Sequence, residues 1–230
     1  MARRPIAVVT GASRGIGRAL AKRLAATYDI AAVARSENEL AQLTHEIEAD
    51  GGVCRAIPLD ITDADAVERA LGDVDAQVLV NNAGVATMKP MAELTVDEWH
   101  HMVDVNLNAL FYVTRALLPK MIERRSGFIV NIGSLAGRSS FVGGTAYSAT
   151  KHAVIGFSES LMLEVRDAGV RVSVVMPGSV ATGFSGRAGD RSWMLTPEEI
   201  ADAVADVIDT PANMLISRLE VRPAIAKKRQ

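Results

Sequence analysis

Cysteine, aromatic residues and excess charge of either sign are all scarce in this sequence of 230 residues. Its single cysteine, Cys54, has no second thiol to pair with, so an internal disulfide is excluded and a reducing compartment, the cytoplasm, is expected. The 25 basic and 27 acidic side chains give a formal charge of -2, which predicts no general attraction to nucleic acid or to anionic lipid. No apolar run approaches the ~18–20 residues that a membrane-spanning helix needs, so we expect no membrane partner.

Histidine is scarce as well, and its positions do not suggest a metal site. The four histidines are His45, His100, His101 and His152. None belongs to a Cys/His cluster with the spacing of metal ligands. We therefore expect no bound metal, and a chain of this length buries enough surface to fold without one.

Short apolar runs rich in β-branched residues alternate along the chain with stretches of helical periodicity. Strands are expected at residues 6–10, 30–34, 53–59, 77–80, 128–132, 170–175 and 214–221. Helices are expected at residues 15–27, 36–49, 62–71, 96–125 and 147–168, and from Thr196, with Ser36 and Thr196 as N-caps. This alternation predicts an α/β fold, a Rossmann-type doubly wound sheet of about seven mainly parallel strands with helices on both faces. Because no linker or repeat interrupts it, residues 1–230 are expected to form a single domain, with a short lid at about residues 181–195.

A glycine-rich turn connects the first expected strand with the first expected helix. It reads Thr10-Gly11-Ala12-Ser13-Arg14-Gly15-Ile16-Gly17. In this position glycines let the backbone turn tightly and approach a pyrophosphate, whose charge lies at the helix N-terminus. The alternative is a glycine-rich turn that binds nothing, but the strand–turn–helix context favours a nucleotide site.

The end of the second expected strand indicates which nucleotide is preferred. An acidic residue there would bond the ribose hydroxyls of NAD and repel a 2′-phosphate, but this chain has Arg35 instead. Arg35 and Arg14 are both able to form charge-assisted bonds with a phosphate, so NADP(H) is predicted in preference to NAD(H). Two solvent-facing arginines are the alternative. Asp60, after the third strand, is a candidate for bonding the adenine amine, or else a helix cap shared with Thr62.

A tyrosine and a lysine lie four residues apart on one predicted helix face, at Tyr147 and Lys151. A free tyrosine has a pKa of about 10 and is a poor acid or base near neutrality. A neighbouring ammonium favours the phenolate, so Lys151 is expected to lower the pKa of Tyr147. Ser134 follows the fifth strand, at the edge of a doubly wound sheet where ligands bind.

With these motifs the sequence resembles the short-chain dehydrogenase/reductase family. The matching residues follow the family's order over about residues 6–182 and are residues 10–17, Asp60, Asn81, Asn82, Ala83, Gly84, Asn106, Ser134, Tyr147, Lys151, Pro177, Gly178 and Thr182. The resemblance implies that Tyr147 is the general acid in reduction and the base in oxidation, and that Ser134 polarises the substrate carbonyl. It also implies that Lys151 holds the nicotinamide ribose and that Asn106 anchors a water for proton relay.

The residue patterns and the resemblance together give the full set of expected cofactor contacts. These are Gly11, Ser13, Arg14, Gly15, Ile16, Gly17, Arg35, Asp60, Ile61, Asn82, Ala83, Gly84, Tyr147, Lys151, Pro177, Gly178, Val180 and Thr182. Asn81 is expected to fix the turn that precedes the cofactor floor.

Substrate selection is expected from a mostly apolar pocket in which Ser134 and Tyr147 are the polar pair. The lining candidates are Leu135, Val142 and Phe184, with Met88, Gly143, Trp193 and Met194 in addition. For each of them loop packing is the alternative. The C-terminal end lacks the Gly-Gly pair of acyl-carrier-protein reductases. It is more similar to members that oxidise small hydroxy acids or 3-hydroxy amino acids, or that reduce varied ketones.

Three other functions remain as alternatives. A regulator could sense NADP(H) without turnover, although a sensor needs no proton donor. A 3-oxoacyl reductase is disfavoured by the C-terminal end. A sugar-nucleotide epimerase or dehydratase is disfavoured by the glycine spacing and by the lack of a separate substrate domain. By resemblance, the chain is expected to act on a small molecule as a homodimer or homotetramer.

Overall fold

A seven-stranded sheet with the strand order β3-β2-β1-β4-β5-β6-β7 forms the centre of the molecule. The computed structural model describes residues 4–184 and 190–225. The strands are β1 (Ile6–Thr10), β2 (Asp29–Ala34), β3 (Cys54–Pro58), β4 (Ala76–Asn81), β5 (Gly127–Ile132), β6 (Val170–Pro177) and β7 (Arg218–Val221). All six neighbouring pairs are parallel, so this is the predicted Rossmann-type sheet.

Helices connect successive strands, as a parallel sheet requires. They are α1 (Gly15–Leu24), α2 (Glu37–Ala49), α3 (Ala64–Leu71), α4 (Val96–Val103), α5 (Ala109–Arg124), α6 (Thr145–Val165) and α7 (Pro197–Ile208). Short helical segments are η1 (Met91–Glu93), η2 (Asp104–Asn108), η3 (Leu135–Gly137) and η4 (Arg166–Ala168). Both predicted caps are present: Ser36 accepts from the Glu39 N–H, and Thr196 forms a capping box with Glu199.

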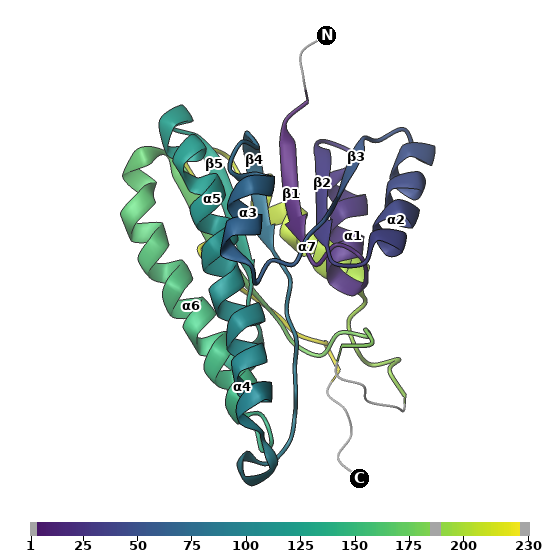
Figure 1. The fold of residues 1–230 in the computed structure, drawn as a ribbon, viewed down its shortest axis with the longest axis vertical. Helices are drawn as coiled ribbons and strands as arrows, with labels where there is room; N and C mark the ends of the chain where they lie inside the picture. Colours follow the sequence, from purple (N-terminus) through teal and green to yellow (C-terminus); the bar gives the residue numbers. More distant parts are fainter. Residues whose placement is uncertain (1–3, 185–189, 226–230) are drawn as a thin grey trace.

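The helices cover the two faces of the sheet and leave apolar strands buried between them. One core cluster packs α1, α2 and α7 against the sheet, and a second packs α3, α5 and α6 against its other face (Figure 1). Because both faces are covered, the central strands are almost continuously apolar, as in β1 and β4.

Several element boundaries differ from the sequence prediction. The helix expected over residues 96–125 is interrupted by the five-residue π-helix η2, and the helix expected from residue 62 begins at Ala64 after the N-cap Asp63. The helix expected over residues 15–27 ends at Leu24, and the last strand covers only Arg218–Val221 of the expected 214–221. Apolar spacing alone does not reveal such ends, because hydrogen bonding and capping decide them.

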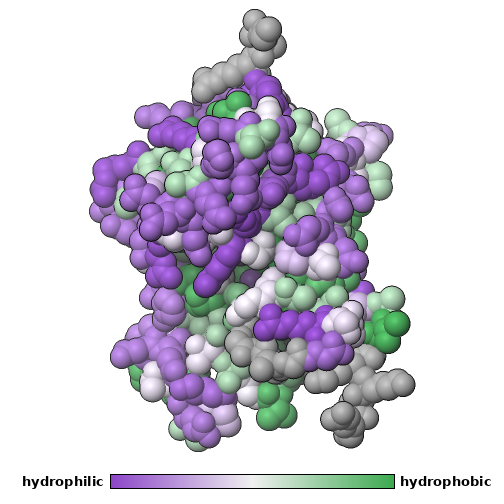
Figure 2. All heavy atoms as spheres, turned by 90° about the vertical axis from the view of Figure 1, so that its right-hand side faces the viewer, coloured by the Kyte–Doolittle hydropathy of each residue, from purple (hydrophilic) through white to green (hydrophobic). Residues whose placement is uncertain are grey.

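The carboxyl ends of the parallel strands meet at one edge of the sheet, at the lower end in Figure 1. The strand order reverses between β1 and β4, which is where ligands of doubly wound sheets bind. Figure 2 shows that this lower part of one face exposes apolar residues, whereas the upper part is mainly hydrophilic.

Within the described residues, no helix combines the length and apolarity needed to cross a bilayer.

Candidate functional site

Two glycines of the turn after β1, Gly11 and Gly17, leave no room for a side chain. Gly11 and Gly15 have φ angles of 65° and 55°, in the left-handed region that favours glycine. A Cβ on Gly11 would lie 2.9 Å from Cα of Ala83, and one on Gly17 would lie 2.2 Å from the carbonyl oxygen of Gly11. The turn therefore brings its backbone against the loop after β4 and into the start of α1.

Asn82 and Thr10 tie this turn to the neighbouring strand end. The Asn82 side chain donates to the carbonyl of Thr10 at 2.9 Å, and the Thr10 hydroxyl accepts from the N–H of Asn82 and of Ala83 at 3.0 and 3.1 Å. Asn81, which is expected to fix the turn after β4, is the last residue of that strand. Its side chain lies inside the protein and donates to Thr114 and Asn131.

The N-terminus of α1 has the features of an anion site. Its N-cap, Arg14, forms no side-chain capping bond, and no acidic residue lies in the first turn. The first N–H groups of a helix have no partner within the helix and carry a partial positive charge. Together with the glycine turn, they fit the pyrophosphate of a dinucleotide. Ser13 lies in this turn, and Ile16 packs against the core below it.

The basic residues predicted for the 2′-phosphate are solvent-exposed at the same edge of the sheet. Arg14 precedes α1, and Arg35 follows β2. Asp60 accepts hydrogen bonds from the backbone and hydroxyl of Thr62 at 3.0 and 2.7 Å, which hold the pKa of its carboxyl below the ordinary value. Arg35 acts on that pKa in the same direction. Ile61, next to Asp60, packs against the core.

The site brings together Ser134, which follows the end of β5, with Tyr147 and Lys151, which lie near the beginning of α6. Burial raises the pKa of Tyr147, and a hydrogen bond with Ser134 acts in the opposite direction. Lys151 lies with Nζ 5.9 Å from the Tyr147 ring centroid and donates to the carbonyl of Ile132 at 2.8 Å. The sequence predicts that Lys151 lowers the pKa of Tyr147. The pKa of Tyr147 is raised instead, because burial has the largest influence on it.

Lys151 is itself almost completely buried, with 4% of its surface exposed. Burial lowers its pKa from 10.5 to about 8, because the ammonium loses hydration. A Cβ on Gly84 would lie 3.8 Å from Lys151 Nζ, so the loop after β4 reaches the lysine.

Asn106 lies within η2 and braces the same loop. Its carboxamide nitrogen donates to the Val85 carbonyl at 2.9 Å and to the Thr150 hydroxyl at 3.1 Å, and its oxygen accepts from the Val85 N–H at 2.8 Å. An amide oxygen has two lone pairs, so one remains for the water that the sequence predicted. The Thr150 hydroxyl in turn donates to the carbonyl of Tyr147. The π-helix thus places Asn106 between the loop and the helix that bears the tyrosine.

The segment after β6 passes close to the glycine turn. Pro177 ends β6, and the Gly178 N–H donates to the Val221 carbonyl at 2.8 Å. Val180 forms an isolated bridge with Leu195, which closes the base of the expected lid. A Cβ on Gly15 would lie 3.4 Å from Cγ2 of Thr182, so Thr182 faces the start of α1. Of the expected lid, residues 185–189 lie outside the described residues.

Two of the substrate candidates, Phe184 and Met88, pack near Tyr147. Phe184 lies beside Tyr147, with ring centroids 5.9 Å apart. Leu135 packs toward Gly178, since a Cβ on that glycine would lie 3.1 Å from Leu135 Cδ1. Val142 is fully exposed, so no contact in this arrangement supports it as a lining residue. Met88 is partly buried and packs against the apolar cluster that contains Tyr147.

The sequence did not predict several residues that hold the site together. Ile132 offers its carbonyl to Lys151, and Thr150 links Asn106 with the tyrosine backbone. Thr10 is the first residue of the glycine motif, and the sequence predicts no role for its hydroxyl. Because a backbone carbonyl and buried hydroxyls carry no chemical motif, only their position in the fold indicates these roles.

The described residues contain no cluster of three or more His, Cys, Asp or Glu side chains placed to bind a metal ion.

Comparison with known proteins supports one family. The family model described as short chain dehydrogenase matches residues 5–192. The chain is 36% identical over 237 residues to the NADP-dependent 3-hydroxy acid dehydrogenase YdfG of Escherichia coli (strain K12), covering 95% of this chain and 94% of that protein. It is 35% identical over 227 residues to the 3-oxoacyl-[acyl-carrier-protein] reductase FabG of Salmonella typhimurium, covering 96% of this chain and 88% of that protein.

Solved structures give the same result. The closed form of a serine dehydrogenase complexed with NADP+ superimposes with a TM-score of 0.89 at 34% identity, covering 98% of this chain and all of that chain. A serine dehydrogenase from Escherichia coli gives a TM-score of 0.86, also at 34% identity, covering 97% of this chain and all of that one.

Proposed function

Since the chain belongs to the short-chain dehydrogenase family and is an oxidoreductase of that family, we propose that it interconverts a small 3-hydroxy acid and its 3-oxo acid. The class includes 3-hydroxy amino acids such as serine. NADP(H) is the cofactor, as in the relatives named NADP-dependent and in the NADP+ complex of the similar serine dehydrogenase. The observation that carries the proposal is the contact of Tyr147 with Ser134 beside Lys151.

Each site residue has a distinct part in the reduction. When bound, NADPH supplies a hydride to the carbonyl carbon. Tyr147 donates its hydroxyl proton to the carbonyl oxygen, so that an alcohol forms; in oxidation it takes that proton back. Ser134 donates a hydrogen bond to the same oxygen and orients it. Lys151 holds the ribose and offers a positive charge to the phenolate that develops on Tyr147.

The surrounding residues position this chemistry. The glycine turn and the α1 N-terminus bind the pyrophosphate, and Arg14 and Arg35 bind the 2′-phosphate. Asn106 holds a water that returns a proton toward Lys151. Phe184, beside the tyrosine ring, and Leu135 contribute apolar surface to the substrate pocket, and the described residues 181–184 and 190–195 belong to the lid.

The test is a turnover assay with purified protein. NADPH and NADH are each offered with ketones, β-keto acids and their esters, and the oxidised cofactors with hydroxy acids, while absorbance of the reduced cofactor is followed. We expect turnover of 3-hydroxy acids with NADP+ and none in Tyr147→Phe, which should still bind NADPH. Tight NADPH binding without turnover of any compound would instead identify a sensor. Full activity of Tyr147→Phe would contradict the proton-transfer role.

A second candidate is reduction of 3-oxoacyl thioesters, which the likeness to FabG supports. The two reactions share the carbonyl chemistry and differ in what is attached to the substrate. A 3-oxoacyl thioester in the same assay distinguishes them. A higher kcat/KM for the thioester than for every free acid would replace the hydroxy-acid proposal.

We further propose that the chain assembles as a homodimer or homotetramer. Apolar side chains of Phe111 and Ile122 on α5 and of Leu163 on α6 are exposed to solvent, although such residues more often pack in a core or an interface. Sedimentation velocity at several protein concentrations tests this. A single monomeric species throughout would refute the proposal.

A further inference from the structure

A network of buried, hydrogen-bonded polar side chains connects β4, α5, β5 and α6 next to the proposed site. The Asn81 amide nitrogen on β4 donates to the Thr114 hydroxyl on α5 at 3.0 Å and to the Asn131 carboxamide oxygen on β5 at 2.9 Å. The Asn131 amide nitrogen then donates to the Ser158 hydroxyl on α6, also at 2.9 Å. The exposed fraction of each of these four side chains is 5% or less.

The hydrogen bond between Asn131 and Ser158 joins the two elements next to which the catalytic groups lie, β5 and α6. Asn131 lies on β5, three residues before Ser134. Ser158 lies on α6, two helical turns after Lys151 and on the same face. The bond between them therefore lies farther along the same strand–helix contact that brings Ser134 to Tyr147.

Besides this bond, the Lys151 ammonium on α6 donates to the Ile132 carbonyl at the end of β5, and the contact around Ser158 is mainly apolar. Around Ser158, α6 meets the sheet mainly through apolar side chains, including Val154, Leu161 and Val165. Apolar burial is non-directional and sets no unique position along the helix axis. A satisfied buried hydrogen bond does, because moving either partner leaves a polar group without one.

We propose that Asn131 and Ser158 form a positioning pair, which sets the place of α6 along β5 and thereby the approach of the Tyr147 hydroxyl to Ser134. The inference rests on the proposed function, since it concerns the efficiency of that reaction. Asn131 is held in turn by Asn81, whose neighbour Asn82 fixes the glycine turn. The same network therefore relates the catalytic helix to the cofactor-binding loop.

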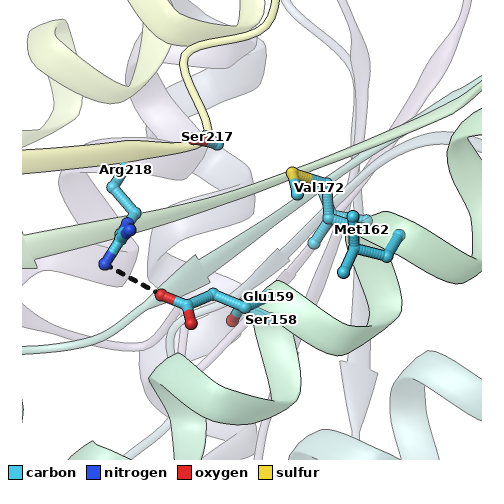
Figure 3. A pocket seen from close by; sticks show the side chains of 7 residues that line it. Ser158, Glu159, Met162, Val172, Ser217 and Arg218 are labelled. Carbon is cyan, nitrogen blue, oxygen red and sulfur yellow. Dashed lines mark ion pairs between the residues drawn. The ribbon is translucent and has the colours of Figure 1, made fainter.

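The surroundings of Ser158 provide matched variants. Ser158 and Glu159 border a cavity of about 220 Å³ between α6, β6 and β7, where Glu159 pairs with Arg218 at 3.0 Å (Figure 3). Ser158→Thr keeps the hydroxyl at the border of this cavity and adds one methyl group. Glu159→Gln weakens an ion pair on the next residue of the same helix but leaves the positioning pair intact.

The test compares steady-state kinetics of the wild type with these variants. A misplacement of about 1 Å costs a reaction of this kind about 100-fold, so we expect Ser158→Ala to lower kcat about 10- to 100-fold. KM for NADPH and substrate should change much less than kcat, because no side chain of the proposed binding surfaces is replaced. Ser158→Thr and Glu159→Gln should retain the wild-type kcat. Wild-type kcat in Ser158→Ala, or an equal loss in Glu159→Gln, would overturn the inference.

Two further measurements keep the inference testable if the Ser158→Ala variant does not fold or if the wild type lacks the proposed activity. If Ser158→Ala does not fold, N131A combined with S158A removes both partners of the bond, while the Asn81 amide nitrogen keeps the Thr114 hydroxyl as an acceptor; the same fall in kcat is expected. Crystal structures of wild type and Ser158→Ala need no turnover. A longer separation between the Ser134 and Tyr147 hydroxyls supports the inference even if the wild type lacks the proposed activity, and an unchanged separation refutes it.

Discussion

At the scale of the residue, burial alters the chemistry of the proposed proton-transfer group. Tyr147 and Lys151 are both nearly inaccessible, and burial disfavours the charged form of each. The pKa of the tyrosine is therefore raised and that of the lysine lowered, so that burial keeps the phenol protonated and makes the ammonium easier to deprotonate. At pH 7 Lys151 is mainly protonated and positively charged, because its pKa of about 8 lies above that pH.

The buried charge of Lys151 predicts a pH-dependent stability. Between pH 8 and 10.5 the unfolded chain holds a proton on Lys151 that the folded protein has released, so the free energy of unfolding rises with pH from this group. Relative to Lys151→Met, the wild type should gain up to about 3 kcal/mol across that window, since one pKa unit corresponds to about 1.4 kcal/mol. Urea unfolding of both proteins at pH 7 and pH 10 measures the gain. A constant difference between the two proteins would contradict it.

Arg35 should decide between the two nicotinamide cofactors. A charged group bonded to a phosphate contributes about 1.5–3 kcal/mol, so Arg35→Ala should weaken NADPH about 10- to 100-fold. NADH lacks the 2′-phosphate, and its affinity should change little. Titration calorimetry with both cofactors provides the comparison, with Arg55→Ala on the exposed side of β3 as the control. Equal weakening of both cofactors would remove the case for a 2′-phosphate site at this position.

At the scale of the element, two helix glycines differ in what surrounds them. Gly17 is on the face of α1 that meets the glycine turn, and a Cβ there would lie 2.2 Å from the Gly11 carbonyl oxygen. Gly156 lies in α6 with nothing within 4 Å of the same position. One glycine is needed for close packing, while the other only reduces the helix propensity of its element.

Substitution of these two glycines by alanine should have opposite effects. Gly156→Ala should raise the free energy of unfolding by about 1 kcal/mol, the difference in helix propensity between the two residues. Gly17→Ala should lower it and weaken NADPH, because α1 must move away from the turn. Denaturant unfolding with and without NADPH tests both variants. A Gly17→Ala protein as stable as the wild type, with full NADPH affinity, would show that the turn tolerates a side chain.

At the scale of the whole molecule, the cofactor is expected to hold together parts that are far apart in sequence. The loops after β1, β4, β5 and β6 all reach the same edge of the sheet (Figure 1). A ligand that binds only the folded arrangement stabilises it by mass action.

NADPH should therefore raise the stability of the entire fold. At a concentration of about 100 times Kd the gain is about 2.7 kcal/mol, which thermal unfolding detects as a higher Tm. Tyr147→Phe should show the full gain, because the ring still fits, whereas Arg35→Ala should show a smaller one at the same NADPH concentration. No rise in Tm for the wild type would contradict NADPH binding at this edge.

The sequence by itself determined the sheet, its approximate strand positions and the family. Apolar runs buried on both faces and the glycine turn were sufficient for the fold, since both depend on local patterns. The residues of the proposed reaction were also predictable, because Tyr147 and Lys151 are related by helix spacing and Ser134 by its place after a strand.

Only the tertiary structure decided how those residues are supported. The link from Asn131 to Ser158 joins residues 27 positions apart, and that from Asn81 to Asn131 joins residues 50 apart. The same packing removes Lys151 from water and directs its ammonium to the Ile132 carbonyl. Hydrogen bonds between distant segments and the loss of hydration depend on which surfaces meet when the chain folds, and a local sequence pattern contains neither.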